Sequence, residues 1–476
     1  MHITHTLPHR GALHKVHRCC AIQIAHTLKS FKQHISEAPE SYNNHIGVPL
    51  TALGMQLNSD AAVFELATSA CGEIHALSSM VNPHIRIISD IQPAHLAGFA
   101  TQDMAAVLDE KLELFKSARP TDALVFNIAN RGVWQSIADP FGIGSATVPN
   151  NEHPLWAFGV SDALCSDTLQ DLSKTLPGLP AILAVDVRCC LQLHAESAAW
   201  MPQTSFKLYL QECSQQQTSS CRPPPSQASS AMEDGREFTS SCVHVCVPAL
   251  GKQLACNAAL TAATACAWMC MQRKAGNAEP NGASSQLSCH KIAREVMLHL
   301  ETHAWWESWK MPPGRMTMHQ LKEGVIVLDD TYNANPASMM SALKTMSDLE
   351  VDCDGEVTVR RLCVLGGMAE LGRKEQQYHQ KVFESAVDLD GSSVILWGKA
   401  WRNVVVDQCY TAAREQERVT WCVSAEGAGA VTDYVIEWLE SKRTGSCART
   451  LNIVLLKGSR TQQVERVLQL LQTRQL

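Results

Sequence analysis

Short runs of apolar residues recur along the first part of the chain, and each run ends in polar residues. Stretches with apolar residues at helical spacing, such as residues 102–118, separate these runs. The alternation predicts buried strands linked by helices, which together form a mostly parallel sheet covered on both faces. The expected strands of this first unit lie at residues 61–65, 85–91, 123–127, 156–160 and 181–187.

The same alternation of apolar runs and helical segments begins again after Met311-Pro312-Pro313-Gly314, a segment with the composition of a hinge. The part of the chain after this hinge has roughly 160 residues, a common size for one domain. We therefore expect a second, Rossmann-like unit. Its expected strands lie at residues 325–328, 361–365, 393–397, 419–423 and 451–456.

Two polar stretches interrupt the pattern. Residues 213–240 contain prolines, serines and glutamines but few apolar residues, so folding would not offset the entropy of ordering them. We predict a disordered surface insertion there, and residues 274–288 have a similar composition. Between the two stretches, residues 258–271 are rich in alanine and predict a helix that packs closely against the sheet.

Composition and charge narrow the class of protein. The 476 residues are 45% hydrophobic and 18% charged, as in a globular protein of two or three domains. The net charge of −7 gives no basic surface for nucleic acid. No apolar run approaches the ~18 residues that a membrane span needs. The 19 cysteines include no C-x-x-C pair, which favours small buried side chains in a reducing compartment over a zinc site.

The first 36 residues contain no Asp or Glu, several basic residues and many histidines. This composition is compatible with a targeting segment. Residues 14–31 also carry apolar side chains near helical spacing, which is equally compatible with the first helix of the domain. The histidines lack neighbouring cysteines or carboxylates, so we expect solvated side chains rather than a metal site.

The segment Leu328–Pro336, LDDTYNANP, is the best candidate for a functional site. It reads as the end of a buried strand, followed by a polar loop and a helix that Pro336 opens. Ligands of open α/β sheets bind at such strand ends. Two adjacent carboxylates there suit a ribose hydroxyl, a magnesium ion or an amine.

Four further segments occur in a definite order around this one, and together the five resemble the Mur ligase superfamily. Within that superfamily the resemblance is to the UDP-N-acetylmuramoyl-tripeptide–D-alanyl-D-alanine ligases, the MurF type. A relative of folylpolyglutamate synthetase fits the NNHIGVPL and YNANP segments less well. The four segments are YNNHIGVPLT at residues 42–51, VFELATSACGEIHAL at 63–77, VLGGMAELG at 364–372 and LLKGSR at 455–460.

The resemblance implies an α/β fold with two domains. Residues 37–310 would form a truncated central domain with a parallel sheet like that of P-loop NTPases, and residues 311–476 a Rossmann-like C-terminal domain. Residues 1–36 would be a basic N-terminal segment. The two sheet-based lobes are expected to close on each other. The metal-binding groups of the first lobe would then face the Asp and Asn residues of the LDDTYNANP segment in the second.

The resemblance also implies the reaction. ATP would phosphorylate the terminal carboxylate of a UDP-muramoyl-tripeptide, and the amine of D-alanyl-D-alanine would attack the acyl phosphate. Transfer of a phosphoryl group between anions needs positive charge on the oxygens, supplied by Mg²⁺, lysine and backbone amides. The compartment would be the plastid stroma in a eukaryote and the cytoplasm in a bacterium.

The first lobe would supply the metal ligands. Glu65 resembles the family's magnesium-binding glutamate, and His95 matches the histidine that helps to hold a second magnesium. Lys111 resembles the lysine that reacts with carbon dioxide, which converts its amine into a metal-binding carbamate. Among the catalytic candidates, Asn43 and Asn44 would donate to phosphate or substrate beside Lys111, and Lys457 belongs to the KGSR segment.

Nucleotide-binding residues are expected from both lobes. Asn257 resembles the asparagine that contacts adenine, Arg315 the arginine that reaches the phosphates, and Asp330 the acidic residue that holds the ribose. Asn333 and Asn335 would shape the same site.

The chain also departs from the family pattern. No glycine-rich phosphate loop ending in Gly-Lys-Thr precedes Tyr42 in this sequence, and we expect the family's separate UDP-binding N-terminal domain to be missing. Four motif positions differ as well: Gln253, Leu254, Gly367 and Asn130, the last in place of an aspartate. These departures keep open an alternative function, that of a folded relative that binds nucleotide or a partner without turnover.

Overall fold

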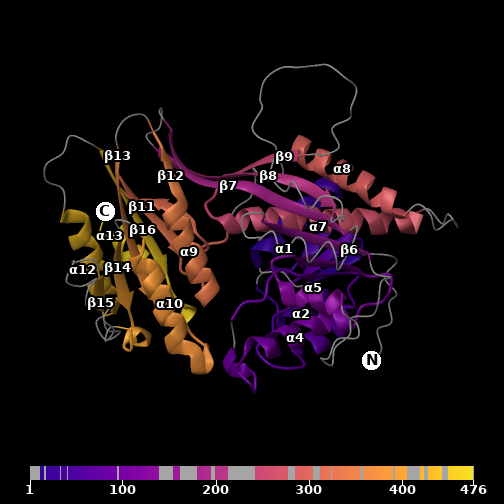
Figure 1. Cartoon of the computed structure of the whole chain (residues 1–476), viewed down its shortest axis with the longest axis horizontal. Helices are drawn as coiled ribbons and strands as arrows, with labels where there is room; N and C mark the ends of the chain where they lie inside the picture. Colours follow the sequence, from indigo (N-terminus) through magenta and orange to yellow (C-terminus); the bar gives the residue numbers. More distant parts are fainter. Residues whose placement is uncertain are drawn as a thin grey trace, which may run out of the picture.

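The chain forms two lobes, each built on one β-sheet, in a computed structural model of residues 1–476 (Figure 1). The structure describes residues 11–14, 18–32, 34–39, 41–93, 96–138, 154–160, 179–194, 199–212, 242–276, 285–303, 311–322, 324–353, 357–389, 392–404, 419–422, 427–441 and 449–474. The predicted insertion at 213–240 lies outside these residues.

The sheet of the first lobe is parallel over most of its width. Its strands follow the order β2-β3-β1-β4-β5-β6-β7-β8-β9, and only the pairs β7–β8 and β8–β9 are antiparallel. All five predicted strands are present, whereas β1, β2 and the antiparallel end were not predicted. The bounds are β1 (Gly11–His14), β2 (Ile35–Glu37), β3 (Ala61–Phe64), β4 (Ile85–Ile88), β5 (Ala123–Asn127), β6 (Leu155–Val160), β7 (Pro180–His194), β8 (Ala199–Glu212) and β9 (Cys242–Val247).

Helices cover both faces of this sheet, as the strand pattern predicted. On one face lie α1 (Arg18–Phe31), α7 (Lys252–Gly276) and α8 (Ser285–His303), which share a core with the inward side chains of the strands. The predicted alanine-rich helix is the central part of α7. The opposite face carries α2 (Gly47–Leu53), α3 (Glu73–Val81), α4 (Met104–Lys116) and α5 (Arg131–Ala138).

Helix α7 is apolar because it is the central core helix of this lobe. Residues Lys252–Arg273 are long and apolar enough to cross a membrane, but 83% of the apolar window is buried inside the fold. Small alanine side chains let the helix approach the sheet closely, and Ala258, Ala259, Ala262 and Ala263 are fully buried.

The beginning of the described chain is built into the first lobe. Strand β1 pairs with β3 on one side and β4 on the other. Helix α1 follows and packs on α7, with Ile24, Ala25 and Leu28 buried in the core. Of the two interpretations of residues 14–31, the helical one agrees with the structure from Arg18 onward.

The second lobe has a six-stranded sheet of order β10-β11-β16-β13-β14-β15, parallel except for β10. Helices α9 (Pro336–Asp348) and α10 (Glu375–Val387) cover one face, and α12 (Gly427–Glu440) and α13 (Glu465–Thr473) cover the other. The five predicted strands are all present. The bounds are β10 (Thr317–Gln320), β11 (Val325–Asp330), β13 (Val357–Gly366), β14 (Ser392–Trp397), β15 (Val419–Cys422) and β16 (Arg449–Lys457).

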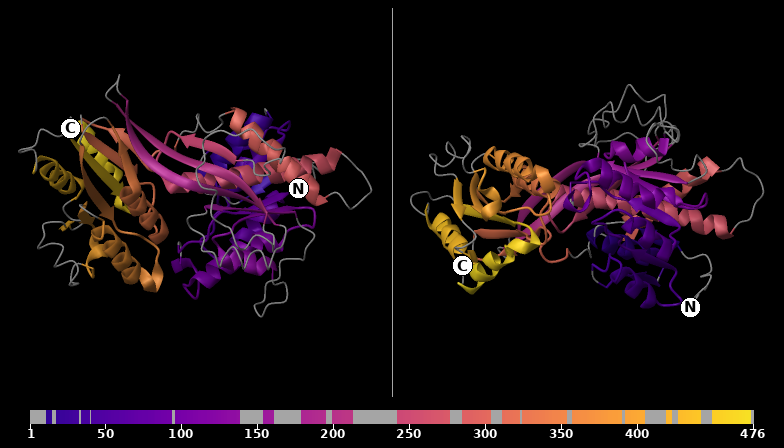
Figure 2. Two further views of the ribbon diagram at one scale, coloured as in Figure 1. Left: turned by 45° about the horizontal axis from the view of Figure 1, so that its top comes forward. Right: turned by 90° about the horizontal axis from the view of Figure 1, so that it is seen from below.

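A long hairpin joins the two lobes. Strands β7 and β8 extend from the first sheet toward the second lobe, as both views in Figure 2 show. There β12 (Leu349–Asp352) adds to β7 in parallel, and Trp200 of β8 is buried in the core of the second lobe. This shared strand pairing fixes the lobes to each other on one side of the cleft between them.

Candidate active site between the two lobes

The carboxyl ends of β11 and β16 place two opposite charges next to each other. The strands are parallel neighbours, with Asp330 in register with Lys457. The Lys457 side chain is 2% exposed, and its ammonium donates to Asp330 Oδ2 at 2.6 Å and to the Asn333 carbonyl at 3.1 Å. A buried cation is tolerated when its charge and protons find such partners. Lys457 was predicted to be catalytic. Its contacts with Asp330 and Asn333 suit a structural role, in which it fixes the loop after β11.

The polar loop after β11 is shaped by bonds between side chains and main chain. Asp329 accepts hydrogen bonds from the Thr331 amide at 3.2 Å and hydroxyl at 2.6 Å. Asn335 caps α9, because its Oδ1 accepts from the Ser338 amide at 2.8 Å while Ser338 Oγ accepts from the Asn335 amide at 3.0 Å. Asn335 lines the cleft, and its side-chain oxygen caps the helix; its predicted role in nucleotide binding stays a prediction.

Arg315 lies at the entrance of the second lobe and stacks on an aromatic ring. Its guanidinium is 4.2 Å from the centre of the Tyr332 ring. Gly314 makes this approach possible: its φ is +72°, its carbonyl accepts from the Tyr332 amide at 2.9 Å, and a Cβ there would lie 3.0 Å from that nitrogen. Within the described residues, the buried Nε of Arg315 has no hydrogen-bond partner. A donor of this kind suits an anionic ligand.

On the first lobe, Lys111 extends from α4 to the loop after β4. Its ammonium donates to the Asp90 carbonyl at 3.0 Å. Burial lowers the pKa of Lys111 to about 8, although the Asp90 carboxylate opposes that shift. A substantial fraction of this amine is therefore neutral near pH 8, which is the form that reacts with carbon dioxide.

Asp90 is itself held by neighbouring donors. Its Oδ1 accepts from Asn130 Nδ2 at 2.9 Å and from the Ile91 amide at 2.8 Å, and Gln92 donates to Oδ2. Asn130, which replaces the family's aspartate, is thus a donor to a carboxylate on the next loop. Sequence reasoning did not assign Asp90, although its place at a strand end was a signal for it.

Glu65 directly follows β3. In the sheet, β1 lies between β3 and β4, so Glu65 is one strand away from the loop after β4. Asn43 donates to Glu65 Oε1 at 3.0 Å, so two predicted site residues are in contact. His95 lies outside the described residues. Glu110, next to Lys111, was not predicted; it is 4% exposed and accepts from the amides of Gly72 and Ile74 at 2.7 Å each. It thereby fixes the loop that runs from Glu65 into α3.

Strand β1 lies between β3 and β4 in the sheet. Residues 15–17, which join β1 to α1, lie outside the described residues, so the expectation that no glycine-rich phosphate loop precedes Tyr42 stays a prediction.

A cleft of about 230 Å³ lies between the lobes, and all five predicted nucleotide-binding residues line it. Asn257 lies on α7, 3% exposed, and its Oδ1 accepts from Cys20 Sγ at 3.0 Å and Gln253 Nε2 at 3.1 Å. Predicted residues from both lobes line the cleft: Asn257, Arg315, Asp330, Asn333, Asn335 and Lys457. Asp90 and Gln92 line it as well.

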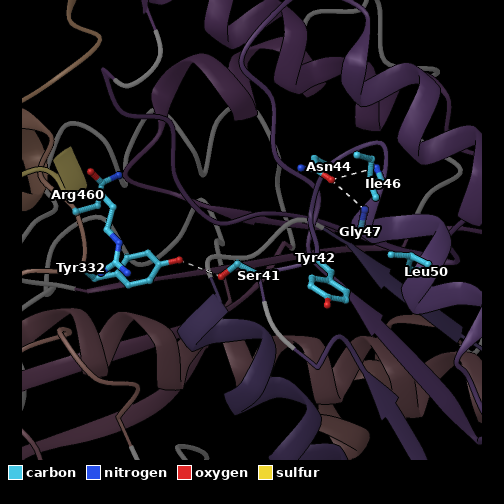
Figure 3. Close-up of a pocket in the computed structure, with 9 residues that line it drawn as sticks. Ser41, Tyr42, Asn44, Ile46, Gly47, Leu50, Tyr332 and Arg460 are labelled. Atoms are coloured by element: carbon cyan, nitrogen blue, oxygen red, sulfur yellow. Dashed lines mark hydrogen bonds between the residues drawn. The ribbon is translucent and has the colours of Figure 1, made fainter.

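A second, larger pocket of about 760 Å³ adjoins this cleft (Figure 3). Its walls combine the loop and first turn at residues 41–50 of the first lobe with Tyr332, Asn333 and Arg460 of the second. The Tyr332 hydroxyl and Ser41 Oγ, 3.1 Å apart, connect the lobes at this point. Asn44, predicted to be catalytic, lines this pocket rather than the cleft.

Comparisons with known proteins agree with this arrangement. Residues 13–164 match the Mur ligase middle domain, and residues 314–460 match the glutamate ligase domain of the Mur ligases. The UDP-N-acetylmuramoyl-tripeptide–D-alanyl-D-alanine ligase of Escherichia coli is 24% identical over 433 residues, with 90% of this chain and 69% of the relative covered. The enzyme of that name from Bacillus subtilis is 22% identical, and the match spans 75% of this chain and 55% of the relative.

Solved structures share the fold. MurF from Acinetobacter baumannii superimposes with a TM-score of 0.60 at 18% identity, covering 97% of this chain and 76% of that one. MurF from Thermotoga maritima in complex with ADP gives a TM-score of 0.58 at 16% identity, covering 98% and 80%. The two matched regions together span more than half of the sequence, and one lies in each lobe. The chain belongs to the Mur ligase family.

Proposed function

We propose that this chain is an ATP-dependent amide ligase of the MurF type. It would join D-alanyl-D-alanine to the terminal carboxylate of a UDP-muramoyl-tripeptide through an acyl phosphate. The relatives that carry this name are bacterial enzymes. We infer a cytoplasmic location for a bacterial source and the plastid stroma for a eukaryotic one.

The observation that carries the proposal is the cleft between the lobes. It brings the unpaired Nε of Arg315 and the Asp330 carboxylate of one lobe opposite Asp90, Gln92 and Asn257 of the other. A cationic fork for phosphates and a carboxylate for ribose hydroxyls are the groups that a nucleotide requires. ADP in the T. maritima structure supports nucleotide as the ligand of this fold.

Magnesium fits the first-lobe residues by their chemistry. Glu65 offers carboxylate oxygen and is oriented by Asn43, and Lys111 has an amine that can lose its proton near pH 8. We propose Glu65, His95 and the carbamate of Lys111 as ligands. When bound, the ion would neutralise the negative charge that phosphoryl transfer gathers on oxygen.

The residues of the chain itself would position the reactants. Arg315, fixed on the Tyr332 ring, would draw the phosphates toward the cleft. Asp330, held by Lys457 and by the Met316 amide at 3.2 Å, would fix the ribose. The cationic groups of the cleft would supply the phosphate contacts.

The proposal is tested with purified protein, ATP, Mg²⁺, UDP-muramoyl-tripeptide and D-alanyl-D-alanine. Release of phosphate that depends on the dipeptide, with the amide product identified by mass spectrometry, is the expected result. Lys111→Ala should abolish it, whereas Lys116→Ala, which removes a lysine paired with Glu113 at the end of the same helix, should not. Nucleotide binding without phosphate release would contradict the proposal and favour the non-catalytic alternative.

A further inference from the structure

The pocket beside the nucleotide cleft has a distinctive distribution of charge. Of the nine residues that line it, Arg460 is the one with a charged side chain, within the part of the chain that the structure describes. The Arg460 side chain is 70% exposed, and its contact with Glu465 is long, at 3.6 Å. An exposed pair of this length contributes little, so the guanidinium remains available to a ligand.

Two asparagine amides add donors to the same pocket. Asn44 Oδ1 accepts from the amides of Ile46 at 3.1 Å and Gly47 at 2.9 Å, which turns its NH₂ group away from that turn (Figure 3). Asn333 Oδ1 accepts from the Ala334 amide at 2.8 Å. Because the main chain occupies both oxygens, each side chain is left with nitrogen donors for a ligand.

An apolar edge completes the pocket. Ile46 and Leu50 line it one turn apart and are 60% and 52% exposed. A single cation, two amide donors and a small apolar surface match a monoanion with short aliphatic side chains. A diphosphate would call for more positive charge than one guanidinium provides.

Tyr332 separates this pocket from the nucleotide cleft. It lines both, with Arg315 at 4.2 Å and Arg460 at 5.9 Å from the centre of its ring. The Tyr332 hydroxyl bonds Ser41 of the opposite lobe. A ligand in the pocket is therefore adjacent to the cleft, with Tyr332 and Asn333 shared between the two.

We propose that this pocket binds the C-terminal carboxylate of the amine-bearing dipeptide, with Arg460 as the residue that selects for it. The proposal rests on the ligase function proposed above and adds to it the subsite of the amine substrate. Asn44 and Asn333 hold the same carboxylate or the neighbouring peptide carbonyl. Ile46 and Leu50 contact the methyl groups.

The test uses binding, so that it does not depend on turnover. Titration calorimetry with the wild-type chain compares D-alanyl-D-alanine with its C-terminal amide, which has the same shape without the negative charge. The acid should bind at least about tenfold more tightly, as expected for one charge-assisted pair. Equal binding of the two ligands, or binding of neither, would overturn the proposal.

Two variants locate the interaction. Arg460→Gln should bind acid and amide equally, while Arg402→Gln, an exposed arginine on another loop, should discriminate as the wild type does. Asn44→Asp keeps the oxygen that the Ile46 and Gly47 amides need but replaces the donor with negative charge. It should weaken binding of the acid about tenfold and spare the amide. Retained discrimination in Arg460→Gln would refute the assignment.

The result can be separated from that of the proposed ligase function. A chain that ligates the dipeptide but whose Arg460→Gln variant keeps the wild-type KM for it retains the function and places the subsite elsewhere. A chain that releases no phosphate, yet distinguishes acid from amide through Arg460, loses the function and keeps the subsite.

Discussion

Lys457 and Asp330 form an ion pair of 2.6 Å between the ends of two neighbouring parallel strands, and the lysine is almost completely enclosed. The pair ties the last strand of the fold to the loop that carries Tyr332, Asn333 and Asn335. Both pockets of the proposed active site therefore depend on one buried contact. Its contribution to folding can be measured apart from catalysis.

Replacing Lys457 by Met should destabilise the second lobe strongly. The change leaves the Asp330 carboxylate without its cation and removes a donor from the Asn333 carbonyl, and loss of one member of a buried pair costs about 3–5 kcal/mol. Urea unfolding measures the effect. Lys399→Met is the matched control, since Lys399 is exposed in the turn after β14 and its loss should cost under about 0.5 kcal/mol. Equal effects would contradict the enclosed pair.

The Lys111 amine should titrate near pH 8. An ordinary lysine holds its proton to about pH 10.5, whereas burial lowers the pKa of Lys111 to about 8. The neutral fraction therefore rises from pH 7 to pH 9 and then levels off. The rate of reaction with cyanate, followed by peptide mass spectrometry from pH 6.5 to 10, should reach half its maximum near pH 8.

A short unstructured peptide with a single lysine provides the control for this titration. Its amine has the ordinary lysine pKa of about 10.4, so its rate should still be rising at pH 10. The comparison uses the pH at which the reaction reaches half its maximal rate. Absolute rates are not compared, because burial also slows access of the reagent to Lys111. A midpoint at pH 10 or above for Lys111 would rule out an amine prepared for carbamate formation.

Removing the Asp122 side chain should destabilise the first lobe. Arg86 and Asp122 form a pair of 3.1 Å with exposures of 2% and 0%, and Arg86 also donates to the Leu114 carbonyl at 2.8 Å. Asp122→Ala leaves the guanidinium buried without its counter-ion, at a cost of about 3–5 kcal/mol. Asp433→Ala, which breaks an exposed pair with Arg474, should change the unfolding free energy by under about 1 kcal/mol. Similar losses in both variants would contradict this difference in burial.

The sequence predicts the parallel strands well because their apolar runs are continuous. Residues 326–328 and 123–126 are buried on both faces of their sheets, so each forms a continuous apolar run. The loop after β11 was also predictable: Asn335 and Pro336 form the start of α9 as expected. Local chemistry alone determines these features.

Elements that depend on distant partners were missed. Strand β1 is only four residues long, and β3 and β4 on either side of it determine its position. The hairpin of β7 and β8 alternates polar and apolar residues, and its outer half is buried only because the second lobe and β12 cover it. The contact of Asn130 with Asp90 joins two loops 40 residues apart. No local pattern identifies such pairs.

Gly47→Ala should damage the dipeptide pocket while leaving the cleft intact. A Cβ at Gly47 would lie 2.5 Å from Tyr42 Cα and 2.6 Å from its carbonyl carbon, so the main chain of the turn would have to move. This turn holds Asn44 through its bonds to the Ile46 and Gly47 amides. We expect a loss of about 1–3 kcal/mol in unfolding free energy and weaker dipeptide binding, with unchanged nucleotide binding.

Gly429→Ala is the control that separates a steric clash from a general effect of losing glycine. Gly429 lies within α12, and a Cβ there would meet nothing within 4 Å. Alanine restricts the unfolded chain more than glycine does, so this variant should be more stable by about 0.4–1 kcal/mol. Urea unfolding and dipeptide titration of both variants give the comparison. If Gly47→Ala were also stabilising and bound the dipeptide normally, the turn would not depend on the close approach of Gly47 to Tyr42, and Asn44 would not need that turn to face the ligand.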